Sequence, residues 1–214
     1  MSNKDIHILT TKNCWFELYI QFLQDKLRDR GFMVSIYYDA SSLPKGEILF
    51  ILSYYKLLNS KALKKHDYNI VIHASDLPKG KGFSPMAWQI LEGKQHIDFT
   101  LFEATEECDA GDYYLKKKLC LNGYETYQEW RDLEGDFVVN MVVEYIDRFD
   151  DLEPIPQSGD ESIYRKRGKN DDEISVENSI KEIFDKLRIC DPEQYPVWFE
   201  HRGRKYNLKL EAWD

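Results

Sequence analysis

Residues 69–93, NIVIHASDLPKGKGFSPMAWQILEG, decide the fold. They begin with a short apolar run of the kind found in a strand covered on both faces, and this run ends at His73. A loop rich in glycine and lysine follows. Pro85 then favours a helix start, where its missing N–H is tolerated, and Gly93 favours the helix end. A histidine at the point where a strand becomes a loop lies where open α/β sheets bind their ligands.

A second polar segment, Glu107-Cys108-Asp109-Ala110-Gly111, is expected to follow a later strand of a βαβ-like layout. If the two strands are neighbours, His73 and Asp109 face each other across one crevice. An imidazole can move protons near neutral pH, and a carboxylate can orient the ring or take a proton from an attacking amine. The alternative is a strand-end histidine bonded to a loop carbonyl, with an ordinary aspartate in a turn.

Composition limits the classes of function. The chain has 214 residues, of which 43% are hydrophobic, and a net charge of −9. Duplex nucleic acid and anionic membranes are therefore not expected as main partners. Four scattered cysteines without a CxxC pair suit a reduced protein and argue against structural zinc. The N-terminus shows no signal-peptide profile, so we expect a cytoplasmic protein.

The apolar pattern predicts an α/β fold with a Rossmann-like, mostly parallel sheet and flanking helices. Asn13 is expected to cap the first helix and Gly31 to end it. The apolar face of that helix is expected to comprise Trp15, Leu18, Tyr19, Phe22, Leu23 and Leu27. Strands are expected at 5–9, 33–38, 46–53, 68–72, 97–104 and 112–121, and a long helix at 126–149. Three lysines at 116–118 indicate an edge strand.

We divide the chain into a core, residues 1–150, and an appendage, residues 151–214. The appendage begins with an irregular segment expected to lie over the active face. A helix at 176–190, with Ile180 among its buried residues, and a β-hairpin around Arg202-Gly203-Arg204 are expected to follow. This small helix and β-hairpin unit cannot fold alone.

Two further groups have chemical alternatives. Cys108 could be a nucleophile, but no local signature supports this, and a small half-buried residue fits better. Lys79 and Lys81 lie in a glycine-bearing loop and could meet a phosphate or carboxylate. A solvated turn explains the two lysines equally well.

The order of residues in 73–85, HASDLPKGKGFSP, followed by Trp88, Gly93 and Asp109-Ala110-Gly111, resembles the signature of the 10-formyltetrahydrofolate-dependent formyltransferases. The form of this block is most similar to the bacterial sugar N-formyltransferases and to the formylating domains of peptide synthetases. The resemblance covers residues 5–121 well and continues weakly over 186–200.

This resemblance implies that His73 and Asp109 are catalytic, that N10-formyltetrahydrofolate is the co-substrate, and that no metal is required. It implies folate contacts from Ser53, Tyr54, Ala104, Thr105, Glu107, Cys108 and Asp109. The sequence departs here from the family pattern Asn-x-His, because the asparagine position of that pattern falls on Val71. Asn69 lies four residues before His73 and cannot take that place. Loss of one oxyanion donor typically costs about 3–4 kcal/mol of transition-state stabilisation.

The resemblance also implies an amine acceptor, which we expect to be a nucleotide-linked amino sugar, such as a UDP-4-amino-4,6-dideoxy sugar of pseudaminic-acid-type biosynthesis. Expected acceptor contacts are Ser75, Asp76, Lys79, Lys81, Tyr164 and Arg165. The acidic chain and short tail disfavour tRNA. A carrier-bound amino acid, another small amine, and a non-catalytic folate or nucleotide-sugar binding protein remain alternatives. A monomer and a homodimer both stay open.

Overall fold

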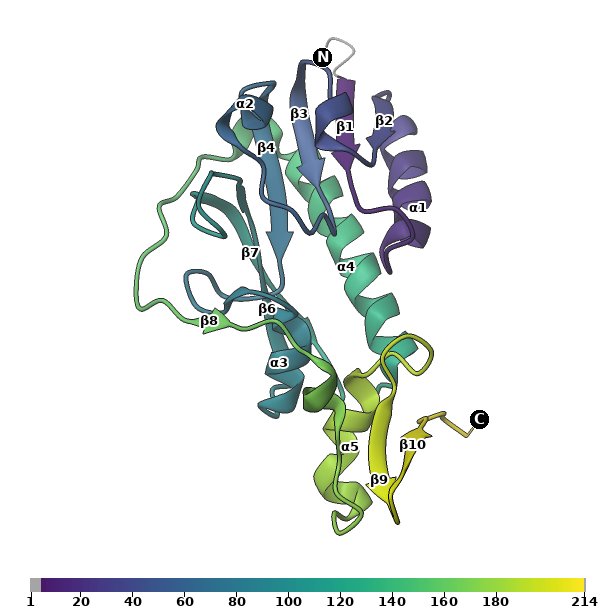
Figure 1. The fold of residues 1–214 in the computed structure, drawn as a ribbon. Coiled ribbons are helices and arrows are strands. Elements are labelled where there is room, and N and C mark those ends of the chain that lie inside the picture. The colour runs from purple at the N-terminus through teal and green to yellow at the C-terminus, as the bar shows by residue number, and fades with distance from the viewer. Residues whose placement is uncertain (1–4, 214) are drawn as a thin grey trace.

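A six-stranded sheet with the order β2-β1-β3-β4-β6-β7 forms the centre of the computed structural model, which describes residues 5–213 (Figure 1). Its strands are β1 (Asp5–Leu9), β2 (Met33–Tyr37), β3 (Gly46–Ile51), β4 (His66–His73), β6 (His96–Glu103) and β7 (Tyr113–Cys120). The first four are mutually parallel, whereas β6 and β7 are antiparallel to their neighbours. The predicted α/β fold is confirmed, and the lysine-bearing strand β7 lies at an edge.

The expectation that the strand before Asp109 runs parallel to β4 is wrong. In the antiparallel pair, Glu103 at the end of β6 lies opposite Ile70, away from the carboxyl end of β4. The intervening helix α3 (Pro85–Leu91) explains this, because its seven residues rise only about 10 Å. The eight residues of β4 extend about 26 Å. The helix is therefore too short to return the chain to the far edge of the sheet.

Two long helices, α1 (Glu17–Arg28) and α4 (Tyr127–Asp147), pack against each other over one face of the sheet. On the other face, α2 (Ser60–Leu63) and the 3₁₀ turn η1 (Ala40–Ser42) cover a smaller apolar cluster made by Leu9, Leu43, Leu49, Ile51 and Leu58. No helix among residues 5–213 is both long and apolar enough to cross a membrane.

The start of α1 differs from the sequence prediction. Asn13 has a left-handed backbone and does not cap the helix, which begins at Glu17. Phe16 enters the core just before the helix, and Ile20, Leu23 and Leu27 continue the buried face at helical spacing. Leu18 and Phe22, both expected to be buried, are 79% and 47% exposed, because that face is rotated away from them.

The C-terminal elements are α5 (Ile180–Ile189) and a hairpin of β9 (Val197–His201) and β10 (Arg204–Leu208). The helix begins later than expected, because Ser179 and Glu182 form a capping box, and Ile180 is exposed rather than buried. Trp130 of α4 donates Nε1–H to the carbonyl of Arg188 at 2.8 Å, so α5 packs against α4. The C-terminal elements thus share the main core.

Residues 152–164, here called the strap, connect these parts. After the 3₁₀ turn η2 (Phe149–Asp151), the strap leaves the end of α4 and passes around the sheet (Figure 1). It forms a bridge between Ile155 and Tyr113, and its strand β8 (Ile163–Tyr164) pairs with β5 (Lys81–Gly82). The strap therefore lies beside the loop that follows His73. The 3₁₀ turn η3 (Lys169–Asp172) then leads toward α5.

Candidate functional site

His73 is the last residue of β4, and its ring bonds to the loop that follows. Nε2–H donates to the carbonyl oxygen of Gly80 at 2.8 Å. The other ring nitrogen, Nδ1, lies 3.9 Å from Oδ2 of Asp109. The two side chains are only 10% and 12% exposed. The structure thus brings together the imidazole and the carboxylate that the sequence pattern pairs, in an environment that shields them from bulk water.

Asp109 is held by backbone geometry and by two neighbouring segments. Its own backbone is left-handed, with φ of +52°. The Gly82 N–H donates to Oδ2 at 2.8 Å. From the strap, Gln157 Nε2 donates to the carbonyl oxygens of Asp109 at 3.1 Å and Gly111 at 2.7 Å. The carboxylate facing His73 is therefore positioned by the glycine loop on one side and by the strap on the other.

Gly111 lets the loop turn back toward the site. A Cβ built on this residue would lie 1.7 Å from the carbonyl oxygen of Glu103. Only glycine permits that approach. Residues 104–110 leave the end of β6 and place Asp109 beside His73, and at Gly111 the chain is back beside Glu103, whose N–H donates to the Asp112 carbonyl at 2.8 Å. The close contact at Gly111 is thus a geometric condition for placing Asp109 beside His73.

A cavity of about 360 Å³ opens at this edge of the sheet, within the size range of small-molecule sites. His73 and Asp109 line it, as does Val71, which occupies the wall where the resemblance places an asparagine. All seven residues expected to contact folate also line it: Ser53, Tyr54, Ala104, Thr105, Glu107, Cys108 and Asp109. The side chain of Asn69 bonds instead to the carbonyls of Leu63 and His66, so it is structural.

Of the six residues expected to contact the acceptor, none lines this cavity. Ser75 and Lys81 are buried in the loop, and Lys81 pairs with Glu161 of the strap at 2.7 Å. Asp76 pairs with Lys116 at 2.6 Å, and Lys79 is exposed. The loop folds onto the strap and β7, which turns these side chains away from the cavity.

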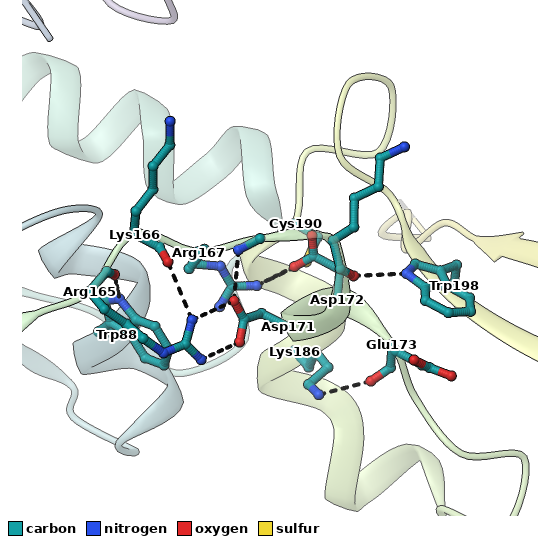
Figure 2. Close-up of polar contacts among 12 residues, drawn as sticks. Trp88, Arg165, Lys166, Arg167, Asp171, Asp172, Glu173, Lys186, Cys190 and Trp198 are labelled. Atoms are coloured by element: carbon teal, nitrogen blue, oxygen red, sulfur yellow. Dashed lines mark hydrogen bonds and ion pairs between the residues drawn. The ribbon is translucent and has the colours of Figure 1, made fainter.

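Tyr164 and Arg165 lie on the outer side of α3. The Tyr164 ring stacks on Trp88, with centroids 6.2 Å apart, and its hydroxyl donates to Glu92 at 2.9 Å. Figure 2 shows Arg165 beside Trp88, paired with Asp171, while Arg167 pairs with Asp172. Both guanidinium groups are thus engaged in ion pairs within the protein, and these contacts attach the segment after the strap to the core.

Several cavity residues were missed by the sequence patterns, most notably Trp15, Arg131 and Glu134. A signal for one of them exists. Glu134 interrupts the apolar face of α4, four residues after Trp130. A buried carboxylate on the apolar face of a helix is rare unless it is paired or functional. Trp15, by contrast, fitted the apolar face of the predicted first helix, so its sequence position gave no such signal.

The surroundings of Cys108 do not favour a thiolate. Burial, with a further contribution from the Asp109 carboxylate, raises the pKa of its thiol to about 11. A neutral thiol is a weak nucleophile, which argues against a nucleophilic Cys108. The residue is exposed, so the expectation that it is half-buried is wrong. Among residues 5–213, no three His, Cys, Asp or Glu side chains gather as metal ligands would.

Comparisons with known proteins agree with this geometry. A model of the formyl transferase family matches residues 22–142. Among curated relatives, methionyl-tRNA formyltransferase from Thermodesulfovibrio yellowstonii is 25% identical over 88% of this chain and 60% of its own length. The enzyme of the same name from Thermosipho melanesiensis is 29% identical over 69% of this chain and 48% of its own length. The match therefore spans only about half of these relatives.

Solved structures share the fold. Methionyl-tRNA formyltransferase from Clostridium thermocellum superposes with a TM-score of 0.82 at 21% identity, covering 99% of this chain and 94% of that chain. HypX from Aquifex aeolicus, in complex with tetrahydrofolic acid, superposes with a TM-score of 0.80 at 21% identity, covering 98% of this chain and 38% of that chain. A 4-N formyltransferase from Francisella tularensis gives 0.70 at 17% identity and covers both chains fully. Since the family model matches more than half of the residues, this chain belongs to the formyl transferase family.

Proposed function

We propose that the protein transfers a formyl group from N10-formyltetrahydrofolate to a primary amine. The observation that carries this proposal is the meeting of His73 and Asp109 in the wall of a cavity at the carboxyl edge of the parallel strands. Family membership supports the reaction class. The cavity volume and the wall formed by 104–109 suit a pteridine, with the glutamate tail of the folate extending into solvent.

The arrangement of the two groups assigns them distinct tasks. Because Gly80 fixes His73 through Nε2, the Nδ1 edge of the ring is left to face Asp109 and the reacting groups. When Nδ1 is protonated as well, the imidazolium stabilises negative charge developing on the formyl oxygen and passes its Nδ1 proton to the departing nitrogen. Asp109 orients the ring and accepts the proton released by the amine. The exclusion of bulk water around both side chains strengthens these interactions.

Val71 stands where the family pattern has an asparagine, and this difference has a chemical consequence. The side chain of Val71 packs against the apolar cluster of Leu9, Leu43, Leu49, Ile51 and Leu58 and offers no hydrogen bond to the cavity. A site that follows the family pattern would have an amide donor here. We propose that His73 alone, with solvent in the cavity, supports the oxyanion, and that turnover is correspondingly slow.

The acceptor we favour is a nucleotide-linked amino sugar. A net charge of −9 offers poor electrostatic attraction for tRNA. The SDLP-x-GKG-x-SP block at 75–85 resembles that of the sugar N-formyltransferases, which supports this acceptor class. The exposed Lys79 remains the proposed contact for the diphosphate. Methionyl-tRNA is the second candidate, favoured by the names of the curated relatives.

One experiment separates these candidates. Purified protein is mixed with 10-formyltetrahydrofolate and with a panel of UDP- and dTDP-linked amino sugars, small amines and methionyl-tRNA, and the release of tetrahydrofolate is followed. We expect turnover with an amino sugar and none with the His73→Ala variant. Turnover with methionyl-tRNA alone would transfer the assignment to that substrate. Tetrahydrofolate binding without any turnover would instead indicate a non-catalytic binding protein.

A further inference from the structure

Glu134 is a buried carboxylate in the wall of the same cavity, contributed by α4. Its side chain is 9% exposed. Oε2 accepts a hydrogen bond from Arg131 Nη1 at 2.6 Å. Among residues 5–213, no donor bonds to the other oxygen, Oε1, and this oxygen is not one of the fully buried unpaired atoms, so it is open to the cavity. Because a carboxylate in a largely buried side chain gains from a hydrogen bond to each oxygen, a donor from a ligand in the cavity suits this position.

Arg131 is fixed and therefore fixes Glu134. Its guanidinium carbon lies 4.5 Å from the ring centroid of Trp15 and 4.2 Å from that of Trp130. Its Nε faces the Tyr127 hydroxyl at 3.4 Å. An arginine stacked between aromatic rings loses most of its freedom on folding rather than on binding. The carboxylate of Glu134 is thus presented to the cavity in one orientation.

Gly135 makes this placement possible. A Cβ on Gly135 would lie 2.5 Å from the ring of Tyr19. The glycine lets α1 approach α4 closely, and the loop before α1 brings Trp15 against Arg131. Gly135 was expected only to weaken the helix, and the structure shows a packing reason for it. The approach closes the α4 side of the cavity around Glu134.

Glu134 and Asp109 reach the cavity from different elements. Asp109 comes from the loop that also forms the proposed folate wall, whereas Glu134 comes from α4. Glu134 is close enough to His73 for their charges to interact. We infer that Glu134 binds the amino group of the acceptor and removes the proton that an ammonium ion must lose before it can attack. This inference rests on the proposed formyl transfer.

The proton balance is complete with the groups present. The ammonium gives one proton to Glu134 and becomes a neutral amine. The amine nitrogen then forms a bond to the formyl carbon, and the bond between that carbon and N10 breaks. The second proton leaves the attacking nitrogen through Asp109 and His73 and is delivered to N10. Glu134 returns its proton to solvent through the cavity, and the carboxylate is restored.

The surroundings suit a base. Burial raises the pKa of Glu134, and Arg131 opposes the rise. The other titratable groups that interact with it are Tyr19 of α1, Tyr55 of the loop after β3, Tyr127 of α4 and His73 of β4. A carboxyl group whose pKa is shifted toward neutrality is a more effective proton acceptor at neutral pH.

The test is the pH profile of kcat/KM for Glu134→Gln, with an acceptor that the wild type formylates. At pH 7 we expect a loss of about 100-fold. The loss should shrink by about tenfold per pH unit as solvent deprotonates the amine, below the pKa of about 10.4 of an alkylamine. The wild-type profile should stay flat over this range. Glu144→Gln is the matched control on α4, because Glu144 pairs with Lys117 and Arg148 on the surface.

The outcomes are distinguishable. An unchanged rate in Glu134→Gln, or a loss that is equal at every pH, overturns the role of Glu134 and leaves formyl transfer intact. Absence of turnover by the wild type with every acceptor overturns the proposed function and this inference together. If the Gln variant does not fold, Glu134→Asp replaces it. That variant retracts the carboxylate by one methylene, so we expect a flat profile at a reduced rate, and an undiminished rate contradicts the inference.

Discussion

His73 satisfies two requirements with one ring. Its Nε2–H is committed to the Gly80 carbonyl, which fixes the tautomer of the neutral ring and its plane. The sequence patterns posed a loop-bonded histidine and a catalytic histidine as alternatives. The geometry shows that the first is compatible with the second, since the bond to the loop leaves Nδ1 free to face Asp109.

Removal of either member of this pair should abolish most turnover. We expect His73→Ala and Asp109→Asn each to lower kcat by about 10²–10⁴-fold, the usual contribution of a positioned acid or base. Urea unfolding should show losses of only about 1 kcal/mol, the net worth of a hydrogen bond. Asp98→Asn is the control, because Asp98 pairs with Lys118 at the sheet edge. Near-native turnover in either variant would refute the assignment.

Gly111 should tolerate no side chain. Gly111→Ala places a methyl group against the Glu103 carbonyl, so the backbone must shift. We expect a loss of at least about 1–3 kcal/mol in the free energy of unfolding, the usual effect of overpacking, together with lower kcat. Urea denaturation measures the first quantity. Gly168→Ala is the control, since open space surrounds Gly168 and its φ is −130°; equal stability of the two variants would contradict the explanation.

At the level of elements, local signals predicted more than long-range pairing did. The strand at β4, the Pro85 helix start and the hairpin β9–β10 follow from nearby residues and are confirmed. The direction of β6 depends on how far α3 carries the chain relative to the length of β4. The apolar pattern of the sequence does not reveal that relation. The antiparallel pairing was therefore missed, although Asp109 still reaches His73 through the loop of residues 104–110.

For the site, the residues predicted to contact folate all line the cavity, and the contact itself stays a prediction. These residues follow strands, so their place at the sheet edge follows from topology. The acceptor residues were chosen for charge in loops, and side chains such as Asp76, Lys81 and Arg165 found ion-pair partners in the folded chain. Such ion pairs depend on segments that are distant in sequence, so the charges of the loop residues alone do not predict them.

A histidine pair joins β1 and β4 at the other end of the sheet. His7 and His66 share a hydrogen bond of 2.7 Å, over Gly46 of β3. Burial, and then His7, lowers the pKa of His66 to about 4, and burial lowers that of His7. The unfolded chain therefore binds protons below about 6.5 that the folded chain resists. Stability should fall as the pH drops from 6.5 toward 4.

The measurement is urea unfolding at pH 7, 6 and 5. His66→Gln should weaken the decline over this range, because the glutamine cannot titrate. His201→Gln is the control, since His201 is exposed on the hairpin. A decline of equal steepness in the wild type and in His66→Gln would show that other groups cause the acid sensitivity.

The strap should act on the site through Gln157. Gln157→Ala removes the two hydrogen bonds to the carbonyls of Asp109 and Gly111, each worth about 0.5–1.5 kcal/mol. We expect kcat to fall by roughly tenfold and hydrogen exchange to accelerate at 109–111. The exposed Gln128, bonded to Asp132, gives the control Gln128→Ala. Unchanged exchange at 109–111 would show that the strap does not hold this loop.

On the scale of the whole molecule, α4 joins the distant parts. Its first turns contact α5 through Trp130 and line the cavity through Arg131 and Glu134, and its last turns pack on the sheet through Tyr145. A ligand in the cavity contacts the sheet edge, the loops and α4 together. Occupancy should therefore stabilise the whole chain rather than one segment.

Thermal unfolding tests this expectation. Tetrahydrofolate at 100 times its Kd should add about 2.7 kcal/mol to the free energy of unfolding and raise Tm in one cooperative transition. Glutamate alone, which matches only the tail of the folate, should give no shift. No stabilisation at saturating tetrahydrofolate would contradict a folate site in this cavity.

The pairing of β5 with β8 has a consequence for biosynthesis. A nascent chain that has emerged from the ribosome through β7 already carries His73, Asp109 and the glycine turn. It still lacks Gln157 and β8, which hold the loops around them. Because N-terminal segments emerge first, the two residues of the proposed catalytic pair are translated before the segments that hold their loops in place. A chain that ends before the strap therefore keeps both residues of the proposed pair and lacks the contacts that hold their loops.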